Sequence, residues 1–230
     1  MKTIYETLLR HYGPQRWWPA DTPFEVMIGA ILTQNTAWSN VEKAIANLRE
    51  HHCLTPESIL AAPTERLAEW IRPSGYFNIK AKRLQNFCRW YCSQGGWKPL
   101  SLRPTPELRR ALLSVSGIGP ETADDILLYA FGRPVFVIDA YTRRLFARLG
   151  KIEGNEPYET LRTLFEETLG TDDPQLFNEY HALIVRHAKE ACSKRPRCHR
   201  CCLATESHCP EGSIKSGQEN VAGKPQSRAG

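Results

Sequence analysis

The chain has 230 residues, of which 41% are hydrophobic and 24% are charged. This size and composition suit one globular unit or two small packed ones, and the lack of an apolar run as long as a membrane span argues against a membrane protein. The net charge of +5 is compatible with a nucleic-acid partner, but equally with a basic protein that has no polyanionic partner.

The N-terminal segment is predicted to be a helix over residues 3–12. It lacks the apolar core of a signal peptide, so we expect a cytoplasmic protein. The helix is broken before Trp17, Trp18 and Pro19, which form a rigid aromatic corner. From the residues alone, two adjacent tryptophans fit core or interface packing better than a ligand site, because tryptophan buries a large area anywhere.

A second helix is expected to begin at Thr22, with Pro23 in its first turn and a strongly apolar middle. It ends in the polar run Thr-Gln-Asn-Thr, which includes Gln34 and which a buried helix could present to a ligand. Trp38 opens the next helix, predicted to run to Arg49. Its aromatic face is suited to stacking on a flat ring, although ordinary packing explains it as well.

A Pro-Ser-Gly turn followed by two aromatic residues precedes a basic helix near the middle of the chain. Tyr76 lies in the turn, and Lys80, Lys82 and Arg83 lie on the helix. The pattern indicates a loop that enters a DNA groove, with the basic side chains as candidate phosphate contacts. A basic helix face that is merely solvated is the alternative.

The most informative stretch is residues 113–139. Gly117 and Gly119 flank one apolar residue, and Pro120 opens a new helix, where its missing N–H costs nothing. Backbone amides at such a helix start form an anion site, which suits DNA phosphate. A short apolar run then ends at a single carboxylate, Asp139.

Asp139 is expected to cap the helix that follows it, and a role in chemistry is equally compatible with its position. Two acidic residues earlier in this stretch, Asp124 and Asp125, lie in the first turn of the helix that Pro120 opens and are interpreted as structural. Two further helices are predicted over 158–169 and 174–191. With no strand pattern longer than 134–138, the fold class is all-α.

The C-terminal region carries five of the eight cysteines. Cys192, Cys198, Cys201 and Cys209 are separated by five, two and seven residues, and Cys202 is an alternative to Cys201. In a reducing cytosol such a group indicates a metal site rather than disulfides. Four thiolates fit either a [4Fe–4S] cluster or zinc, with His199 as a rival zinc ligand, and the spacing does not decide between them. Residues 213–230 have the composition of a disordered tail.

Several of these motifs together resemble the endonuclease III superfamily of DNA glycosylases, defined by a helix-hairpin-helix followed by a Gly/Pro-rich loop and an aspartate. The matching segments are Trp-Trp-Pro at 17–19, Leu-Thr-Gln-Asn-Thr at 32–36, Arg-Pro-Ser-Gly-Tyr-Phe-Asn at 72–78 and the hairpin that begins at Gly117. Within the superfamily the chain is similar to bacterial 3-methyladenine DNA glycosylases of endonuclease III type. The cysteine loop is similar to the C-terminal [4Fe–4S] loop of the superfamily, but its first and last spacers differ in length from those of the superfamily.

The resemblance implies two helical domains flanking a DNA-binding cleft, with a C-terminal iron–sulfur loop. We expect a six-helix domain with the hairpin over residues 21–135. Residues 1–20 and 136–212 should form the second domain, which carries the cysteine loop. The partner would be double-stranded damaged DNA, bound by a monomer that associates with the bacterial nucleoid.

The resemblance also implies roles for individual residues. Asp139 would be catalytic, and the cysteines would hold a [4Fe–4S] cluster, with zinc as the alternative. The extruded base would enter a pocket, and the DNA would be held by several backbone and side-chain groups. The implied base pocket consists of Trp17, Trp18 and Trp38, and the implied DNA contacts are Gln34, Tyr76, Lys80, Gly117, Gly119 and Arg143.

One position bears on the reaction class. Bifunctional members of the superfamily have a lysine two residues after the second hairpin glycine, and its amine forms a Schiff base with the sugar. Here that residue is Glu121, which cannot form an imine. We therefore expect a monofunctional enzyme that hydrolyses the bond to an alkylated base. The alternatives are a glycosylase/lyase acting on oxidised pyrimidines, an adenine or thymine mismatch glycosylase, and a non-catalytic DNA-binding protein.

Overall fold

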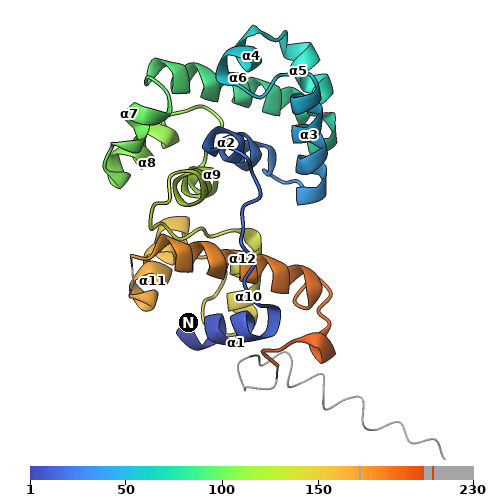
Figure 1. Ribbon diagram of the computed structural model, residues 1–230. Coiled ribbons are helices and arrows are strands. Elements are labelled where there is room, and N and C mark those ends of the chain that lie inside the picture. The colour runs from blue at the N-terminus through green and yellow to red at the C-terminus, as the bar shows by residue number, and fades with distance from the viewer. Residues whose placement is uncertain (171, 205–208, 210–230) are drawn as a thin grey trace, which may run out of the picture. The chain divides into compact units, whose positions relative to one another are not determined.

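The computed structural model describes residues 1–170, 172–204 and 209. Every regular element in these residues is a helix (Figure 1), so the all-α prediction is confirmed. The apolar run at 134–138 has no regular secondary structure. The tail expected from residue 213 onward lies outside the described residues.

The chain divides into two compact units. Among the described residues, the first unit comprises Met1–Trp17, Ile138–Asp172 and those from Leu176 onward, and the second comprises Trp18–Val137 with Asp173–Gln175.

The second unit contains eight α-helices rather than the six expected. Several of them are short, and α4 begins at Thr55 and Pro56, a capping threonine followed by proline, which favours a helix start. The helices are α2 (Pro23–Leu32), α3 (Trp38–Glu50), α4 (Pro56–Ala61), α5 (Thr64–Trp70), α6 (Phe77–Ser93), α7 (Trp97–Ser101), α8 (Thr105–Leu113) and α9 (Pro120–Asp125), with a 3₁₀ turn η1 (Arg72–Ser74) and a π-helical segment η2 (Ile126–Ala130).

Helix α2 is the central element of this unit. The Thr22 side chain accepts a hydrogen bond from the Glu25 amide, so the predicted cap and the proline start are both confirmed. Residues 25–32 are all buried, because α2 packs against α3, α6, α9 and η2. A helix that is apolar on every side is buried on every side. Its C-terminal residues are therefore held in place from all directions.

The first unit is built from α1 (Lys2–Tyr12), α10 (Ala140–Arg148), α11 (Tyr158–Leu169) and α12 (Pro174–Glu190), with a short 3₁₀ turn η3 (Cys198–Arg200). Its core includes Phe146, which packs edge-to-face on Phe165 with ring centres 4.6 Å apart. Tyr180 of α12 is fully buried, and its hydroxyl donates to the Met1 carbonyl, which ties α12 to the start of the chain. None of the helices in the described residues is both long and apolar enough to cross a membrane.

Candidate active site

The hairpin connects α8 to α9 in the second unit through two glycines with different conformations. Gly117 has a φ of +99°, and a Cβ there would lie 2.4 Å from Cγ of Arg83. Gly119 is extended, with a φ of −93°, and a Cβ there would meet nothing within 4 Å. Only Gly117 therefore has the positive φ that glycine permits. What Gly119 provides is open space in front of the start of α9.

Gln34 lies against this hairpin. Its side-chain amide donates to the Gly117 carbonyl at 3.0 Å and to the Thr122 hydroxyl at 2.9 Å. Its side-chain oxygen accepts from the Arg83 guanidinium, whose aliphatic part packs on Gly117. The polar atoms of Gln34 are thus used within the protein. They join the end of α2 to the hairpin rather than projecting freely toward a ligand.

Lys80 was expected to contact phosphate, and the structure corrects this expectation. The residue is only 1% exposed, and its ammonium donates to the Leu32 carbonyl at 2.7 Å, to the Thr36 hydroxyl at 2.8 Å and to the Ser74 carbonyl at 2.7 Å. Burial, with a smaller effect of the Arg83 charge, lowers the pKa of Lys80 to about 8. With all three ammonium protons bonded internally, Lys80 joins the loop after α2 to the turn before α6.

These contacts form one set, which we call the loop network: Gln34, Thr36, Ser74, Lys80, Arg83 and Gly117. Thr36 also donates to the Ser74 carbonyl, so each loop in the network is bonded to another. The sequence placed the two loops near DNA but did not indicate that their polar side chains bond to each other. In the sequence, the only sign of this internal role is the position of Lys80, one turn after the start of a helix.

Tyr76 projects from this network. It is 68% exposed and has a left-handed backbone with a φ of +45°, a conformation that costs energy for a non-glycine residue. Ile79, one turn further along α6, is 53% exposed. Tyr76 was expected to contact DNA, whereas Ile79 was not among the expected contacts. The signal was available, because residues three apart on a helix share one face.

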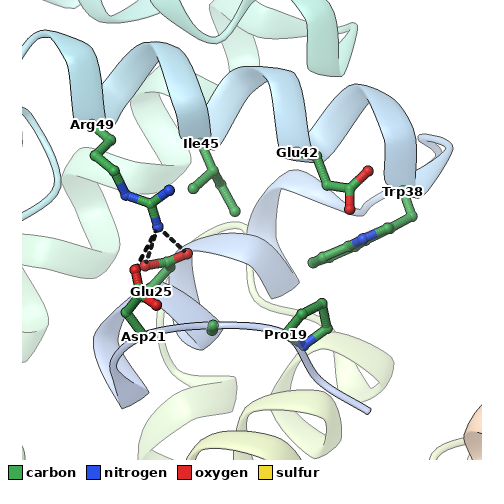
Figure 2. Close-up of a pocket in the computed structure, with 8 residues that line it drawn as sticks. Pro19, Asp21, Glu25, Trp38, Glu42, Ile45 and Arg49 are labelled. Carbon is green, nitrogen blue, oxygen red and sulfur yellow. Dashed lines mark hydrogen bonds and ion pairs between the residues drawn. The ribbon is translucent and has the colours of Figure 1, made fainter. Parts of the chain in front are cut away.

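The tryptophans at the predicted base pocket are partly brought together. Trp18 packs edge-to-face on Trp38 with ring centres 4.9 Å apart. The ring centre of Tyr129 lies 5.0 Å from that of Trp18. Gly29 of α2 makes room for the Trp18 ring, since a Cβ there would lie 3.2 Å from it. Trp38 stands at the start of α3 on the wall of a hollow (Figure 2). Trp17, at the end of a segment of the first unit, is half-buried and remains a predicted pocket residue.

Asp139 stands at the start of α10 in the first unit. As expected, it caps the helix: its Oδ1 accepts from the Thr142 amide at 2.7 Å. Its Oδ2 lies 3.5 Å from Nε2 of His181, a residue of α12 that is 7% exposed and that the sequence analysis missed. Nothing in the local sequence connects the two, because His181 belongs to a helix more than 30 residues later.

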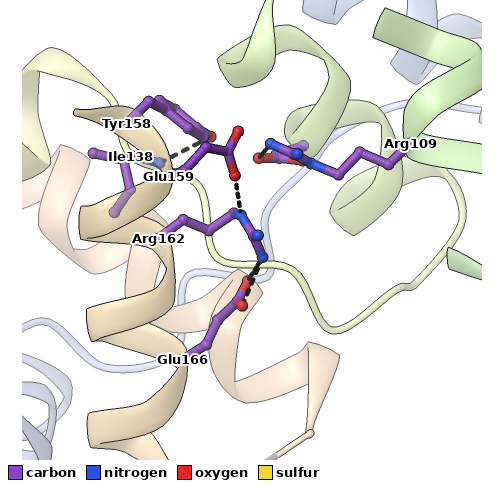
Figure 3. A network of polar contacts seen from close by, with 7 residues as sticks. Arg109, Ile138, Tyr158, Glu159, Arg162 and Glu166 are labelled. Carbon is purple, nitrogen blue, oxygen red and sulfur yellow. Dashed lines mark hydrogen bonds and ion pairs between the residues drawn. The ribbon is translucent and has the colours of Figure 1, made fainter. Parts of the chain in front are cut away.

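These contacts determine the charge of Asp139. Burial by itself raises the pKa of the carboxyl, but the hydrogen bond and charge of His181 and the amide of Thr142 outweigh it and hold the pKa below its usual value. The backbone before Asp139 is also anchored, since the Ile138 amide donates to the Tyr158 hydroxyl at 3.4 Å (Figure 3). The result is an oriented, ionised carboxylate.

Other charged residues near the hairpin and α10 have structural partners. Asp124 is fully buried and bonded to Arg109 at 2.7 and 3.0 Å, so its role is structural as predicted, but through this ion pair and not through a place in the first turn of α9. Arg143 donates to the carbonyls of Glu156 at 2.7 Å and Gly154 at 3.4 Å, which leaves its DNA contact a prediction. Glu121 is exposed in the first turn of α9.

The cysteine region follows α12. Within the described residues, all eight cysteines are free and no group of three or more potential ligands is placed closely enough to hold a metal ion. The donor chemistry nevertheless fits a thiolate site. Cys192 is 7% exposed and accepts from Arg148, and Cys201 lies 3.5 Å from the buried His187. Burial, with a smaller effect of Cys192 and Cys209, raises the pKa of Cys201.

Comparison with known proteins is consistent with this geometry. Residues 28–170 match the model of the HhH-GPD superfamily of base excision DNA repair proteins. The chain is 47% identical to the "Putative DNA repair glycosylase MJ1434" of Methanocaldococcus jannaschii over 86% of this chain and 91% of that protein. It is 30% identical to endonuclease III of Thermotoga maritima over 81% and 82% of the two chains.

Among solved structures, the 3-methyladenine DNA glycosylase of H. pylori bound to 1,N6-ethenoadenine superposes with a TM-score of 0.70 at 32% identity. The match covers 82% of this chain and 96% of that chain. The chain belongs to the HhH-GPD superfamily, and its enzyme class is that of the base-excision DNA N-glycosylases.

Proposed function

We propose that the protein is a monofunctional DNA glycosylase that hydrolyses the bond between deoxyribose and an alkylated base. The observation that carries the proposal is the oriented, ionised carboxylate of Asp139, combined with an exposed carboxylate, Glu121, where bifunctional members have an amine. A carboxylate can stabilise positive charge and activate water, but it cannot form a Schiff base. Strand cleavage would therefore need a separate amine.

The mechanism follows from the charge that develops on the sugar. Breaking an N-glycosidic bond builds an oxocarbenium-like transition state, and a preorganised carboxylate stabilises that charge without having to reorient. The Thr142 amide fixes Oδ1 of Asp139, and His181 lies beside Oδ2. In this arrangement Asp139 stabilises the sugar cation and orients or deprotonates the attacking water.

The choice of an alkylated base rests on the aromatic cluster. Trp18 and Trp38 provide ring surface, and a cationic alkylated base is attracted by such faces. Such a base already leaves easily, so the site needs no strong general acid. Trp17 is included in the proposed pocket as the third tryptophan.

Double-stranded DNA would be held by the second unit and by Arg143. Gly119 leaves the start of α9 open to a phosphate, Gly117 shapes the turn, and Tyr76 is exposed as an apolar wedge. Gln34 would fix the hairpin through its bonds to Gly117 and Thr122 and would reach DNA by exchanging these bonds on binding. The protein would act as a monomer in the cytoplasm, in association with the nucleoid.

We also propose a [4Fe–4S] cluster on Cys192, Cys198, Cys201 and Cys209, with zinc as the alternative. Arg148 and Arg144 donate to the Cys192 carbonyl, and Arg148 also donates to its sulfur, which compensates the negative charge of a thiolate site. When bound, such a group would cross-link the loop that follows α12. Cys201 is preferred to Cys202 because it keeps the two-residue spacer after Cys198.

The test is incubation of the purified protein with methylated duplex DNA, with free bases and strand breaks measured with and without later alkali. Release of methylated purines, with breaks only after alkali, is expected. Breaks without alkali, together with borohydride trapping on abasic DNA, would replace the proposal by a glycosylase/lyase. Release from oxidised or mismatched duplexes alone would assign one of the other substrate classes.

A further inference from the structure

A hollow of about 370 Å³ lies beside Trp38 in the second unit. One wall is a single face of α3, because Trp38, Glu42, Ile45 and Arg49 are spaced at helical intervals. The opposite wall is the segment that contains Pro19 and leads to α2. The volume falls within the roughly 300–1,000 Å³ of small-ligand sites. The hollow therefore has room for a flat ring against Trp38.

The charges around this hollow are unequally distributed. At one end, the Arg49 guanidinium bonds Asp21 at 2.9 Å and Glu25 at 2.9 and 3.0 Å, so the positive charge is already shared by two carboxylates. At the other end, Figure 2 shows the Glu42 carboxylate turned toward Trp38. Within the described chain Glu42 is exposed and has no ion pair. The side of the hollow next to Trp38 is thus net negative.

A negative charge here is unexpected if the only function of this surface is to bind the DNA backbone. The protein carries a net charge of +5, and Trp38 directly follows the loop that contains Gln34. A carboxylate close to a bound strand repels phosphate and weakens binding that is independent of the base. The same carboxylate beside an aromatic face attracts a cation, and the two effects act together on a positively charged ring.

We infer that the hollow beside Trp38 receives the extruded base and that Glu42 is a specificity residue, which favours positively charged bases such as N7-alkylated purines over their neutral parents. This inference rests on the proposed function, because it assigns the substrate charge at the same base pocket. Glu42 performs no step of the reaction; it acts through its charge on the bound ring.

The experiment measures binding without turnover. Fluorescently labelled duplexes carry either 2′-fluoro-2′-deoxy-7-methylguanosine or 2′-fluoro-2′-deoxyguanosine at one position, and the fluorine prevents release of the base by destabilising the sugar cation. Dissociation constants are measured by anisotropy for the wild type, Glu42→Gln and Glu50→Gln. Glu50 is the matched control, because it is an exposed glutamate of the same helix that does not line the hollow.

The wild type should bind the methylated duplex more tightly, and Glu42→Gln should reduce this preference about fivefold, the size of an ion pair near a protein surface. Binding of the unmethylated duplex should stay equal or tighten, and Glu50→Gln should behave as the wild type. The difference should shrink as salt increases.

The inference is overturned by three results. In the first, the wild type shows no preference for the methylated duplex. In the second, Glu42→Gln keeps the full preference. In the third, Glu42→Gln weakens both duplexes equally, which circular dichroism would connect to folding. Failure of the proposed function is distinct, because it is measured as absent release of methylated bases rather than as absent binding preference.

Discussion

Asp139 in the first unit and Lys80 in the second are both ionisable side chains largely enclosed by protein, yet their surroundings leave them different freedom to act. Asp139 accepts one amide hydrogen bond and lies beside one histidine, and its side chain is 13% exposed. Lys80 is 1% exposed and uses all three ammonium protons on internal acceptors. The Asp139 carboxylate has lone pairs available for a reaction, whereas Lys80 has no ammonium proton available for a ligand.

This difference separates an ionised side chain that is available for the proposed chemistry from one whose charge holds loops in place. In the loop network the polar side chains are bonded within the protein, and two exposed neighbours, Tyr76 and Ile79, are large and hydrophobic. A basic residue in a DNA-facing loop is therefore no guide to phosphate contact. Its acceptors within the protein must be known first.

The largest effect is expected at Asp139. Asp139→Asn should lower kcat for base release by about 10²- to 10⁴-fold, because the amide cannot stabilise the sugar cation or deprotonate water. Binding to a non-cleavable duplex should be nearly unchanged. Single-turnover assays would show this, with Glu167→Gln, an exposed change in the same unit, as the control. An equally active Asp139→Asn would remove Asp139 from the chemistry.

At Lys80 the effect should be on stability. Lys80→Met removes the donor for two buried carbonyls and one hydroxyl, which should cost about 2–4 kcal/mol of unfolding free energy. Urea denaturation would measure this loss. Lys82→Met, an exposed change on the same helix, should have little effect on stability. A Lys80→Met protein of full stability that lost DNA affinity would return Lys80 to the phosphate contacts.

His181 should influence the pH dependence. Because the pKa of Asp139 is held low in the folded enzyme, its ionised form, and the stability that this provides, persists above the ordinary pKa and is lost as pH falls through the lowered value. His181→Gln should raise the acid limb of the kcat/KM profile by about one to three pH units, since a buried carboxyl without its partner is harder to ionise. An unmoved acid limb would show that His181 does not position Asp139.

The smallest effects should distinguish the two hairpin glycines. Gly117→Ala meets the Arg83 side chain at positive φ and should destabilise the protein by about 1–3 kcal/mol. Gly119→Ala has open space and ordinary φ, so its stability should be unchanged while DNA affinity falls a few-fold, because the methyl group obstructs approach to the amides. Thermal melts and anisotropy would separate the two. Equal loss of stability in both would contradict the different roles.

Much of this structure could be predicted from the sequence, and the successful predictions concern residues that are close together in the chain. The cap at Thr22, the helix start at Pro23 and the cap at Asp139 all involve residues within one helical turn. Backbone groups at a helix start must be satisfied locally, so residue type and spacing are enough to indicate the start. The all-α class and the superfamily resemblance arise from the same local patterns, repeated along the chain.

The tertiary structure decided which polar groups are available. The Leu32 carbonyl that captures Lys80 is 48 residues away in the chain, and the Gly117 carbonyl that accepts from Gln34 is 83 residues away. His181 reaches Asp139 from a different helix, and Arg49 is bonded to Asp21 and Glu25 while Glu42 has no ion pair among the described residues. A hydrogen bond depends on where two groups meet in space, and sequence spacing alone does not give that position.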